Sequence, residues 1–306
     1  MPVATLRSLF GARPVKTAER ASGPDFLCVG LQKGGTQWLY DQLQHHPDFW
    51  MPPHKELHYF DRRFPDRRIG PAAKKAVEDP DWIQQKKKMR GDRSLDDRDS
   101  DFFQRVANFS AKKNDLEAYA ELFEPKGDLL SGDITPGYSR LPNRLTRKLS
   151  QRFPDAKVIM MLREPASRMW SQWRMRSEHL EYTEEQQLDF KLFKKFAGRR
   201  QARLRSYPTK IARRWQVHFG DRFRWFFLDD VIADPEQTRV EILKFLGADP
   251  TVPLYVPADF NRKARTKSPE RTDEIKALLR KMFESERRAC ANMFGGAATK
   301  WPDAPY

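Results

Sequence analysis

The sequence predicts an α/β fold in which a parallel sheet is flanked by helices. Three segments support this prediction, and each is an apolar run that is followed by turn residues and then by apolar residues at helical spacing. The runs span residues 25–31, 157–162 and 223–228. Strands that alternate with helices build a parallel sheet with helices on both faces. Ligands of such sheets bind at the carboxyl ends of the strands.

The first strand leads into a glycine-containing turn. The apolar run 25–31 continues as Gln32-Lys33-Gly34-Gly35-Thr36, and Trp38, Leu39 and Leu43 then follow at helical spacing. A buried strand, a glycine turn and a helix in this order are typical of phosphate-binding folds. We therefore expect a P-loop-like sheet within a single domain.

The remaining elements follow the same pattern. Pro165 lies after the strand 157–162 and suits the first turn of a helix, where its missing N–H costs nothing. The run 223–228 precedes a helix expected over 236–246, which Gly247 ends. A fourth strand is predicted over Leu129 to Thr135, where Pro136 closes it.

A charged stretch separates the first and fourth strands. It contains Lys86-Lys87-Lys88 and Asp96-Asp97-Arg98-Asp99, and a structureless loop of that length is uncommon. We expect a charged helical insertion over about residues 62–128, either a mobile cap over the site or a solvated surface. The domain spans 24–306 and follows a basic N-terminal arm, 1–23.

Composition restricts the possible classes of protein. The 306 residues include 57 Lys and Arg against 42 Asp and Glu, a net charge of +15. A hydrophobic content of 39% argues against a disordered polycation. The charge points to an anionic partner: nucleic acid, an acidic membrane surface, a phosphorylated cofactor or an acidic polymer. Two cysteines exclude a disulfide framework, and no apolar run approaches the ~20 residues of a membrane span. We expect a cytoplasmic protein, possibly peripheral at the membrane.

The glycine turn has the features of an anion site. Gly34 and Gly35 let the backbone approach a ligand, the helix N-terminus adds partial positive charge, and Lys33 and Thr36 add donors. The lysine precedes the glycine pair, whereas in a Walker A loop it follows the last glycine. Arg163 follows the second strand, and Ser171 lies about two helical turns further on, so the two form a candidate site for a second phosphate.

A carboxylate and an imidazole follow the anion loop. Glu56 and His58 lie two residues apart in a stretch predicted to be extended, where alternate side chains share a face. The pair forms a candidate base and orienting partner, and either residue could be the base.

Four motifs in order resemble a known family. They are Gly30 to Leu39, His46-Pro47, Lys55 to Asp61, and Leu162 to Ser171. Together they resemble the sulfotransferases that use 3′-phosphoadenosine 5′-phosphosulfate (PAPS), nearest to the heparan sulfate and bacterial carbohydrate branch. The resemblance implies PAPS as donor and 3′-phosphoadenosine 5′-phosphate (PAP) as product, without a metal.

The resemblance also implies roles for individual residues. Lys33, Gly34, Gly35, Thr36 and Gln37, with Trp38 beside them, would hold the 5′-phosphosulfate, and Arg163 and Ser171 the 3′-phosphate. Lys263 and Arg265 would belong to a basic loop that closes over the nucleotide. Glu56 would be the base, His58 its neighbour and Asp61 an acceptor-site acid.

One position departs from the heparan branch. A lysine precedes the Thr-Pro pair there, whereas this chain has Ile134 before Thr135. A heparan-like acceptor is therefore in doubt. Asp133 is instead expected to face the site and bind the acceptor, with Tyr138 as a wall residue.

The predicted reaction is direct in-line transfer to a hydroxyl or amine of a carbohydrate, lipid or small metabolite. Glu56 takes the proton, and Lys33 with the loop amides stabilises charge on the leaving phosphate. Two alternatives stay open: an atypical P-loop phosphotransferase and a non-enzymatic binder of polyanions or nucleic acid. The absence of a zinc-finger spacing, RRM signature or basic-zipper register makes nucleic acid an unexpected partner.

Overall fold

A four-stranded parallel sheet forms the centre of the computed structural model, which describes residues 22–89, 92–254, 256–260 and 269–306. The strands are β1 (Phe26–Cys28), β2 (Gly132–Ile134), β3 (Lys157–Leu162) and β4 (Phe223–Phe227), in the order β2-β1-β3-β4. Phe26 pairs with Gly132 and with Lys157, and Val158 pairs with Phe223. All four predicted strands and the parallel fold class are confirmed, although β1 and β2 are shorter than expected. Most of the expected N-terminal arm lies outside the described residues.

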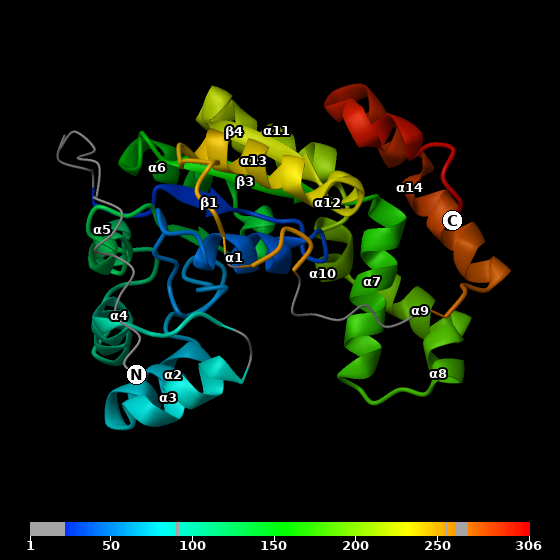
Figure 1. Cartoon of the computed structure of the whole chain (residues 1–306). Coiled ribbons are helices and arrows are strands. Elements are labelled where there is room, and N and C mark those ends of the chain that lie inside the picture. The colour runs from blue at the N-terminus through cyan, green and yellow to red at the C-terminus, as the bar shows by residue number, and fades with distance from the viewer. Residues whose placement is uncertain (1–21, 90–91, 255, 261–268) are drawn as a thin grey trace.

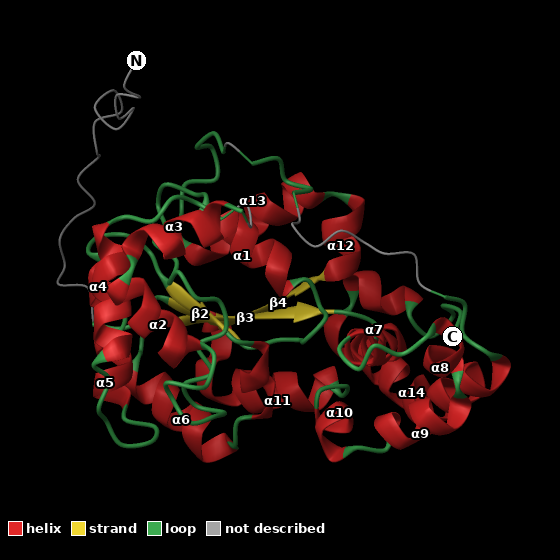
Figure 2. Ribbon diagram, turned by 90° about the horizontal axis from the view of Figure 1, so that it is seen from below, coloured by secondary structure: helices red, strands yellow, loops and turns green. Residues whose placement is uncertain are grey.

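Helices cover both faces of the sheet (Figure 2). Because strand side chains alternate, Leu27, Val158 and Met160 enter one core cluster, while Ile159 and Met161 enter another. Figure 2 shows α6 and α11 on one face and α1, α12 and α13 on the other. The bounds are α1 (Thr36–Gln44), α6 (Asn143–Arg152), α11 (Pro208–Phe219), α12 (Leu228–Ala233) and α13 (Pro235–Leu246).

The charged stretch is helical, as predicted, and it packs into the main core. Its helices are α2 (Ile69–Glu78), α3 (Pro80–Lys88), α4 (Asp97–Ala107), α5 (Leu116–Glu121) and the 3₁₀ turn η2 (Glu124–Lys126). Buried Ile69, Phe102 and Tyr119 share a cluster with Leu27 of β1. The insertion is therefore a continuation of the domain core.

A third cluster extends the domain beyond the end of β3 (Figure 1). It joins α7 (Pro165–Glu178), α9 (Phe190–Ala197), α10 (Arg200–Leu204) and α14 (Asp273–Phe294), with α8 (Glu184–Leu188) beside them. Short 3₁₀ turns complete the fold: η3 (Pro136–Arg140), η4 (Gly220–Arg222) and η5 (Gly296–Lys300). No described helix has the length and apolarity to span a bilayer.

Two helix ends follow the sequence prediction closely. Pro165 is in the first turn of α7, and the preceding Glu164 caps it by accepting from the N–H groups of Ala166 and Ser167. Gly247 ends α13 with a left-handed φ of 88°. These ends fix where the chain leaves the strands.

The strand order also determines where a ligand can bind. From β1 the chain goes to β2 on one side and then to β3 on the other, so the connections from the ends of β1 and β3 diverge. Such a switch point leaves a crevice at the carboxyl ends of the two strands. The anion loop follows β1, and Arg163 follows β3.

Candidate active site

The loop after β1 is held against β3 by main-chain hydrogen bonds. The N–H of Leu31 donates to the carbonyl of Met161 (2.6 Å), and the N–H of Met161 donates to that of Gly30 (2.6 Å). Lys33 and Gly35 then adopt positive φ values of 72° and 100°. The loop therefore leads directly from the sheet into α1.

Gly34 has no space for a side chain. A Cβ added there would lie 2.5 Å from the carbonyl oxygen of Met161 and 3.0 Å from that of Leu31. Both neighbours are backbone atoms that cannot rotate away. The glycine is therefore needed for this close approach of loop and strand.

The N-terminus of α1 is open to an anion. Gly35 occupies the N-cap position, and no side chain caps this helix end. The first N–H groups of a helix have no partner within it, and they carry partial positive charge. Gly35 and Thr36 thus offer main-chain donors at this helix end, whereas the N–H of Gly34 donates to the carbonyl of Leu31 (2.9 Å).

Lys55 connects this helix end to the candidate base. Its Nζ lies 3.4 Å from Thr36 Oγ1 and 3.0 Å from Glu56 Oε1. The Lys55 side chain is 14% exposed and that of Glu56 is 34% exposed, so the ion pair is partly buried. We did not assign a role to Lys55 from the sequence, although its place beside Glu56 was the signal for it.

Glu56, His58 and Asp61 form a connected chain. His58 Nε2 lies 3.2 Å from Glu56 Oε2, and His58 Nδ1 lies 2.9 Å from Asp61 Oδ1. The side chains of His58 and Asp61 are 5% and 4% exposed, whereas that of Glu56 is 34% exposed. Glu56 is thus the member of the chain that a substrate can reach.

The backbone reaches this arrangement without a strand. Glu56 and His58 both have left-handed φ values, 66° and 57°, so the predicted extended stretch is wrong. The two side chains meet because of this paired turn geometry and not because of strand alternation. Their juxtaposition itself was expected.

Glu56, His58 and Asp61 stabilise one another's charged forms. Burial lowers the pKa of His58, but the hydrogen bonds and charges of Asp61 and Glu56 outweigh burial and raise it. Burial raises the pKa of Glu56, but Lys55 and His58 outweigh it and hold the pKa well below the usual value. Glu56 is therefore a carboxylate at neutral pH.

Arg163 lies at the junction of β3 and the anion loop. Its guanidinium donates to the carbonyl of Lys33 (3.1 Å), so the ends of β1 and β3 are joined by this residue. Ser171 lies in α7, and both side chains are partly exposed. The two expected 3′-phosphate ligands are therefore partly accessible to solvent.

Asp133 and Tyr138 are in the core, contrary to the expectation that they contact the acceptor. Asp133 is 1% exposed, and its carboxylate accepts from the hydroxyls of Thr135 (2.6 Å), Tyr138 (2.6 Å) and Tyr119 (3.0 Å). Tyr138 is 0% exposed. Both residues hold the segment that carries His58 in place, since the hydroxyl of Tyr138 also accepts from the N–H of Tyr59 (3.1 Å).

The structure places two of the four other expected nucleotide ligands, Trp38 and Gln37, in contacts within the protein. Trp38 is 2% exposed and its indole donates to the carbonyl of Ala258 (2.6 Å), so its ring packs in the core and does not face the crevice. Gln37 donates to Asp41 (2.8 Å) on the first turns of α1. Lys263 and Arg265 lie outside the described residues. Ile134, at the position of the missing lysine, is buried.

Two arginines near Asp61 were missed by the sequence analysis. Arg140 Nη2 lies 3.3 Å from Asp61 Oδ2, and Arg205 donates to the Gln32 side chain in the anion loop (2.8 Å). Arg140 is in η3 and Arg205 follows α10, so both lie outside the four sequence motifs that resemble the sulfotransferases. Nothing in the sequence pattern brings these positions together.

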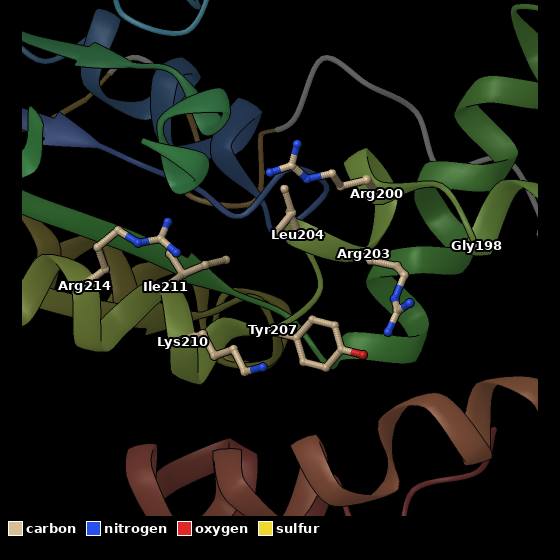
Figure 3. Close-up of a pocket in the computed structure, with 8 residues that line it drawn as sticks. All are labelled: Gly198, Arg200, Arg203, Leu204, Tyr207, Lys210, Ile211 and Arg214. Atoms are coloured by element: carbon tan, nitrogen blue, oxygen red, sulfur yellow. The ribbon is translucent and has the colours of Figure 1, made fainter. Parts of the chain in front are cut away.

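Figure 3 shows a separate pocket. Its volume is about 390 Å³, and residues from α10 and α11, with Gly198 and Tyr207, line it. The anion loop and Glu56 do not contribute to its lining. The pocket is therefore distinct from the crevice between β1 and β3.

Comparison with known proteins identifies the class. The sulfotransferase family model matches residues 24–251, and the chain belongs to this family. A sulfotransferase from Alicyclobacillus acidocaldarius has a similar structure, with 20% identity, a TM-score of 0.56, and 91% of this chain and 98% of that chain covered. A sulfotransferase domain from the curacin biosynthetic pathway is similar at 15% identity and a TM-score of 0.52, with 80% of each chain covered. No curated protein matches the chain. The protein is thus a transferase of sulfuryl groups.

Proposed function

We propose that the chain transfers the sulfuryl group of PAPS to a hydroxyl or amine of its acceptor in one direct displacement. The single observation that carries this proposal is the joining of two anion-binding elements at the switch point. Arg163 after β3 contacts the carbonyl of Lys33, in the loop that leads from β1 to the uncapped end of α1. Family membership supports the chemistry, and the geometry supports a donor with two separated anionic groups.

The residues present fit such a donor. Gly34 packs against β3 with no room for a Cβ, and the uncapped N-terminus of α1 that follows it offers N–H groups to an incoming anion. Lys33, Lys55 and Arg163 surround these groups with positive charge. Lys33, Gly34, Gly35 and Thr36 would hold the phosphosulfate end, and Arg163 with Ser171 the 3′-phosphate. When bound, the donor supplies an activated sulfuryl group and a bisphosphate leaving group.

Glu56 is the proposed general base. It is the exposed member of the Glu56–His58–Asp61 chain and is ionised at neutral pH. Asp61 fixes the orientation of His58, and His58 in turn holds Glu56. The imidazole thereby keeps the Glu56 carboxylate in position to take a proton from the acceptor.

Lys33 provides the direct test. Preorganised donors to developing charge are worth roughly 2.7–4 kcal/mol each. We therefore expect Lys33→Ala to lower turnover of labelled PAPS by on the order of 10²–10³, measured with an acceptor found by screening carbohydrates, lipids and small metabolites. Turnover close to that of the wild type in Lys33→Ala would show that Lys33 does not stabilise the charge on the leaving phosphate.

A further inference from the structure

Arg140 and Arg205 have no role in the proposed donor site, yet they lie near the proposed general base, Glu56, and its neighbour Asp61. Arg140 is the last residue of η3 and contacts Asp61, the inner member of the Glu56–His58–Asp61 chain. Arg205 follows α10 and contacts Gln32 in the anion loop. The pair therefore lies at the acceptor side of the site, since this is the side of Glu56 and Asp61.

Helix α10 brings the two arginines together. Gln201 and Arg205 are four residues apart and so share a face of the helical turn. The Gln201 side chain accepts a hydrogen bond from Arg140. Arg200, Arg203 and Leu204 of the same segment instead line the separate pocket (Figure 3). Arg205 and, through Gln201, Arg140 thus adjoin the side of α10 that contacts the anion loop.

Their charges are incompletely compensated. Arg140 shares Asp61 with His58, and no carboxylate of the described residues lies within ion-pair distance of Arg205. The Nε atoms of both arginines are buried and have no hydrogen-bond partner within the described chain. Burial lowers the pKa of Arg205 to about 10, and repulsion by Arg140 adds to this, while Asp61 and Glu56 oppose it. Two neighbouring cations with spare donors are costly unless an anion joins them.

We propose that Arg140 and Arg205 bind an anionic group of the acceptor and so place its nucleophilic hydroxyl or amine at Glu56. Carboxylate, sulfate and phosphate share the planar or forked oxygen geometry that a guanidinium binds with two hydrogen bonds. The inference rests on the proposed function, because it takes Glu56 as the base. It adds that the acceptor is negatively charged, and it identifies the residues that select it.

Paired probes test the proposal in the full-length protein saturated with PAP. The probes are glucuronate against glucose, and 4-hydroxyphenylacetate against tyrosol, so each pair differs in the anionic group. Ligand-observed NMR measures their binding. In the wild type we expect the anion of at least one pair to bind about tenfold or more tighter, as a charged hydrogen-bonded contact provides.

Variants assign that preference to the two arginines. Arg205→Gln should abolish it and Arg140→Gln should weaken it, whereas Arg213→Gln, a control at an exposed arginine of α11, should keep it. Arg140 is partly exposed, so Arg140→Gln carries the test if Arg205→Gln does not fold. Thermal melts of each variant establish folding.

The outcomes separate the two proposals. PAP binding without any preference for the anionic probes, or a preference that survives both substitutions, overturns the charged-acceptor proposal alone. Absence of PAP binding in the wild type overturns the proposed function. Loss of PAP binding in Arg205→Gln or Arg140→Gln would assign these residues to the donor and likewise refute the acceptor role.

Discussion

Glu56, the proposed base, combines a low pKa with a partly exposed side chain. Its side chain is 34% exposed, and Lys55 and His58 hold its pKa well below the usual value, against the effect of burial. A carboxylate in this state is always ionised at neutral pH, but it is a weak base. The strength of Glu56 as a base therefore depends on how firmly Lys55 stays beside it.

Lys55→Met should make this dependence visible. Removing the cation removes the largest influence that lowers the pKa of Glu56, so that pKa should rise. Since the base works as the carboxylate, the acidic limb of the pH profile of kcat/KM should move to higher pH. The profile is measured by PAPS turnover, with Lys55→Arg as the charge-preserving control. An unmoved acidic limb in Lys55→Met would show that Glu56 is not the group that titrates.

Residues of the site that are close together in the sequence could be predicted, and residues that meet through tertiary packing could not. Glu56, His58 and Asp61 were foreseen because they are neighbours in the chain, and their local turn was enough to bring them together. The position of Asp133 was predicted wrongly, because nothing in the sequence distinguishes a buried carboxylate that accepts from three hydroxyls from an exposed one. Arg140 and Arg205 were missed because they meet the site only through tertiary packing.

The loop between β1 and α1 is constrained by backbone atoms that lie against Gly34. Gly34→Ala would place a methyl group against the carbonyl oxygens of Met161 and Leu31, at 2.5 Å and 3.0 Å. Overpacking of this kind costs about 1–3 kcal/mol and would push the loop from β3. We expect a lower Tm and at least roughly tenfold weaker PAP binding, since the loop amides leave their positions.

Gly70→Ala is the matched control for this substitution. Gly70 lies in α2, where an added Cβ meets its nearest neighbour at an ordinary 3.4 Å. Alanine in a helix is favoured over glycine by roughly 0.5–1 kcal/mol. Gly70→Ala should therefore keep both Tm and PAP binding. Equal PAP affinity in Gly34→Ala and Gly70→Ala would contradict the role given to the loop.

Helix α14 stabilises the start of α7 through a buried ion pair. Arg287, which is 0% exposed, donates to Glu164 (2.7 Å), and Glu164 caps α7 next to Arg163. Breaking a buried pair by removing one partner costs about 3–5 kcal/mol. Arg287→Met should lower the free energy of unfolding by this amount in urea titrations. The exposed pair offers the comparison: Arg288→Met, which loses only a surface contact with Glu284, should change it by less than about 1 kcal/mol.

Elements were easier to predict where the chain has a continuous apolar run. The runs 157–162 and 223–228 were predicted as strands, and they form β3 (157–162) and β4 (223–227). The stretch around Glu56 has no such pattern, and two left-handed residues replace the expected strand. Left-handed φ values at Glu and His have no clear sequence signal, since these positions usually belong to glycine or asparagine.

The whole molecule directs anions to one edge of the sheet. The order β2-β1-β3-β4 places the ends of β1 and β3 side by side, and each end carries a cationic segment. The net charge of +15 is spread along the sequence and favours approach of anions from every side. Selectivity must therefore come from the local geometry of the loop and Arg163. Tight binding should persist at salt concentrations that screen the distributed charge.

Titration of the purified protein with PAP by calorimetry, with ATP and magnesium as the comparison, tests the central claim most directly. We predict selective binding of PAP that persists at about 0.3 M salt and is lost in Arg163→Ala, because the guanidinium joins the two strand ends. Preference for magnesium ATP, or PAP binding that is unchanged in Arg163→Ala, would contradict the account and favour a phosphotransferase or a binder of polyanions.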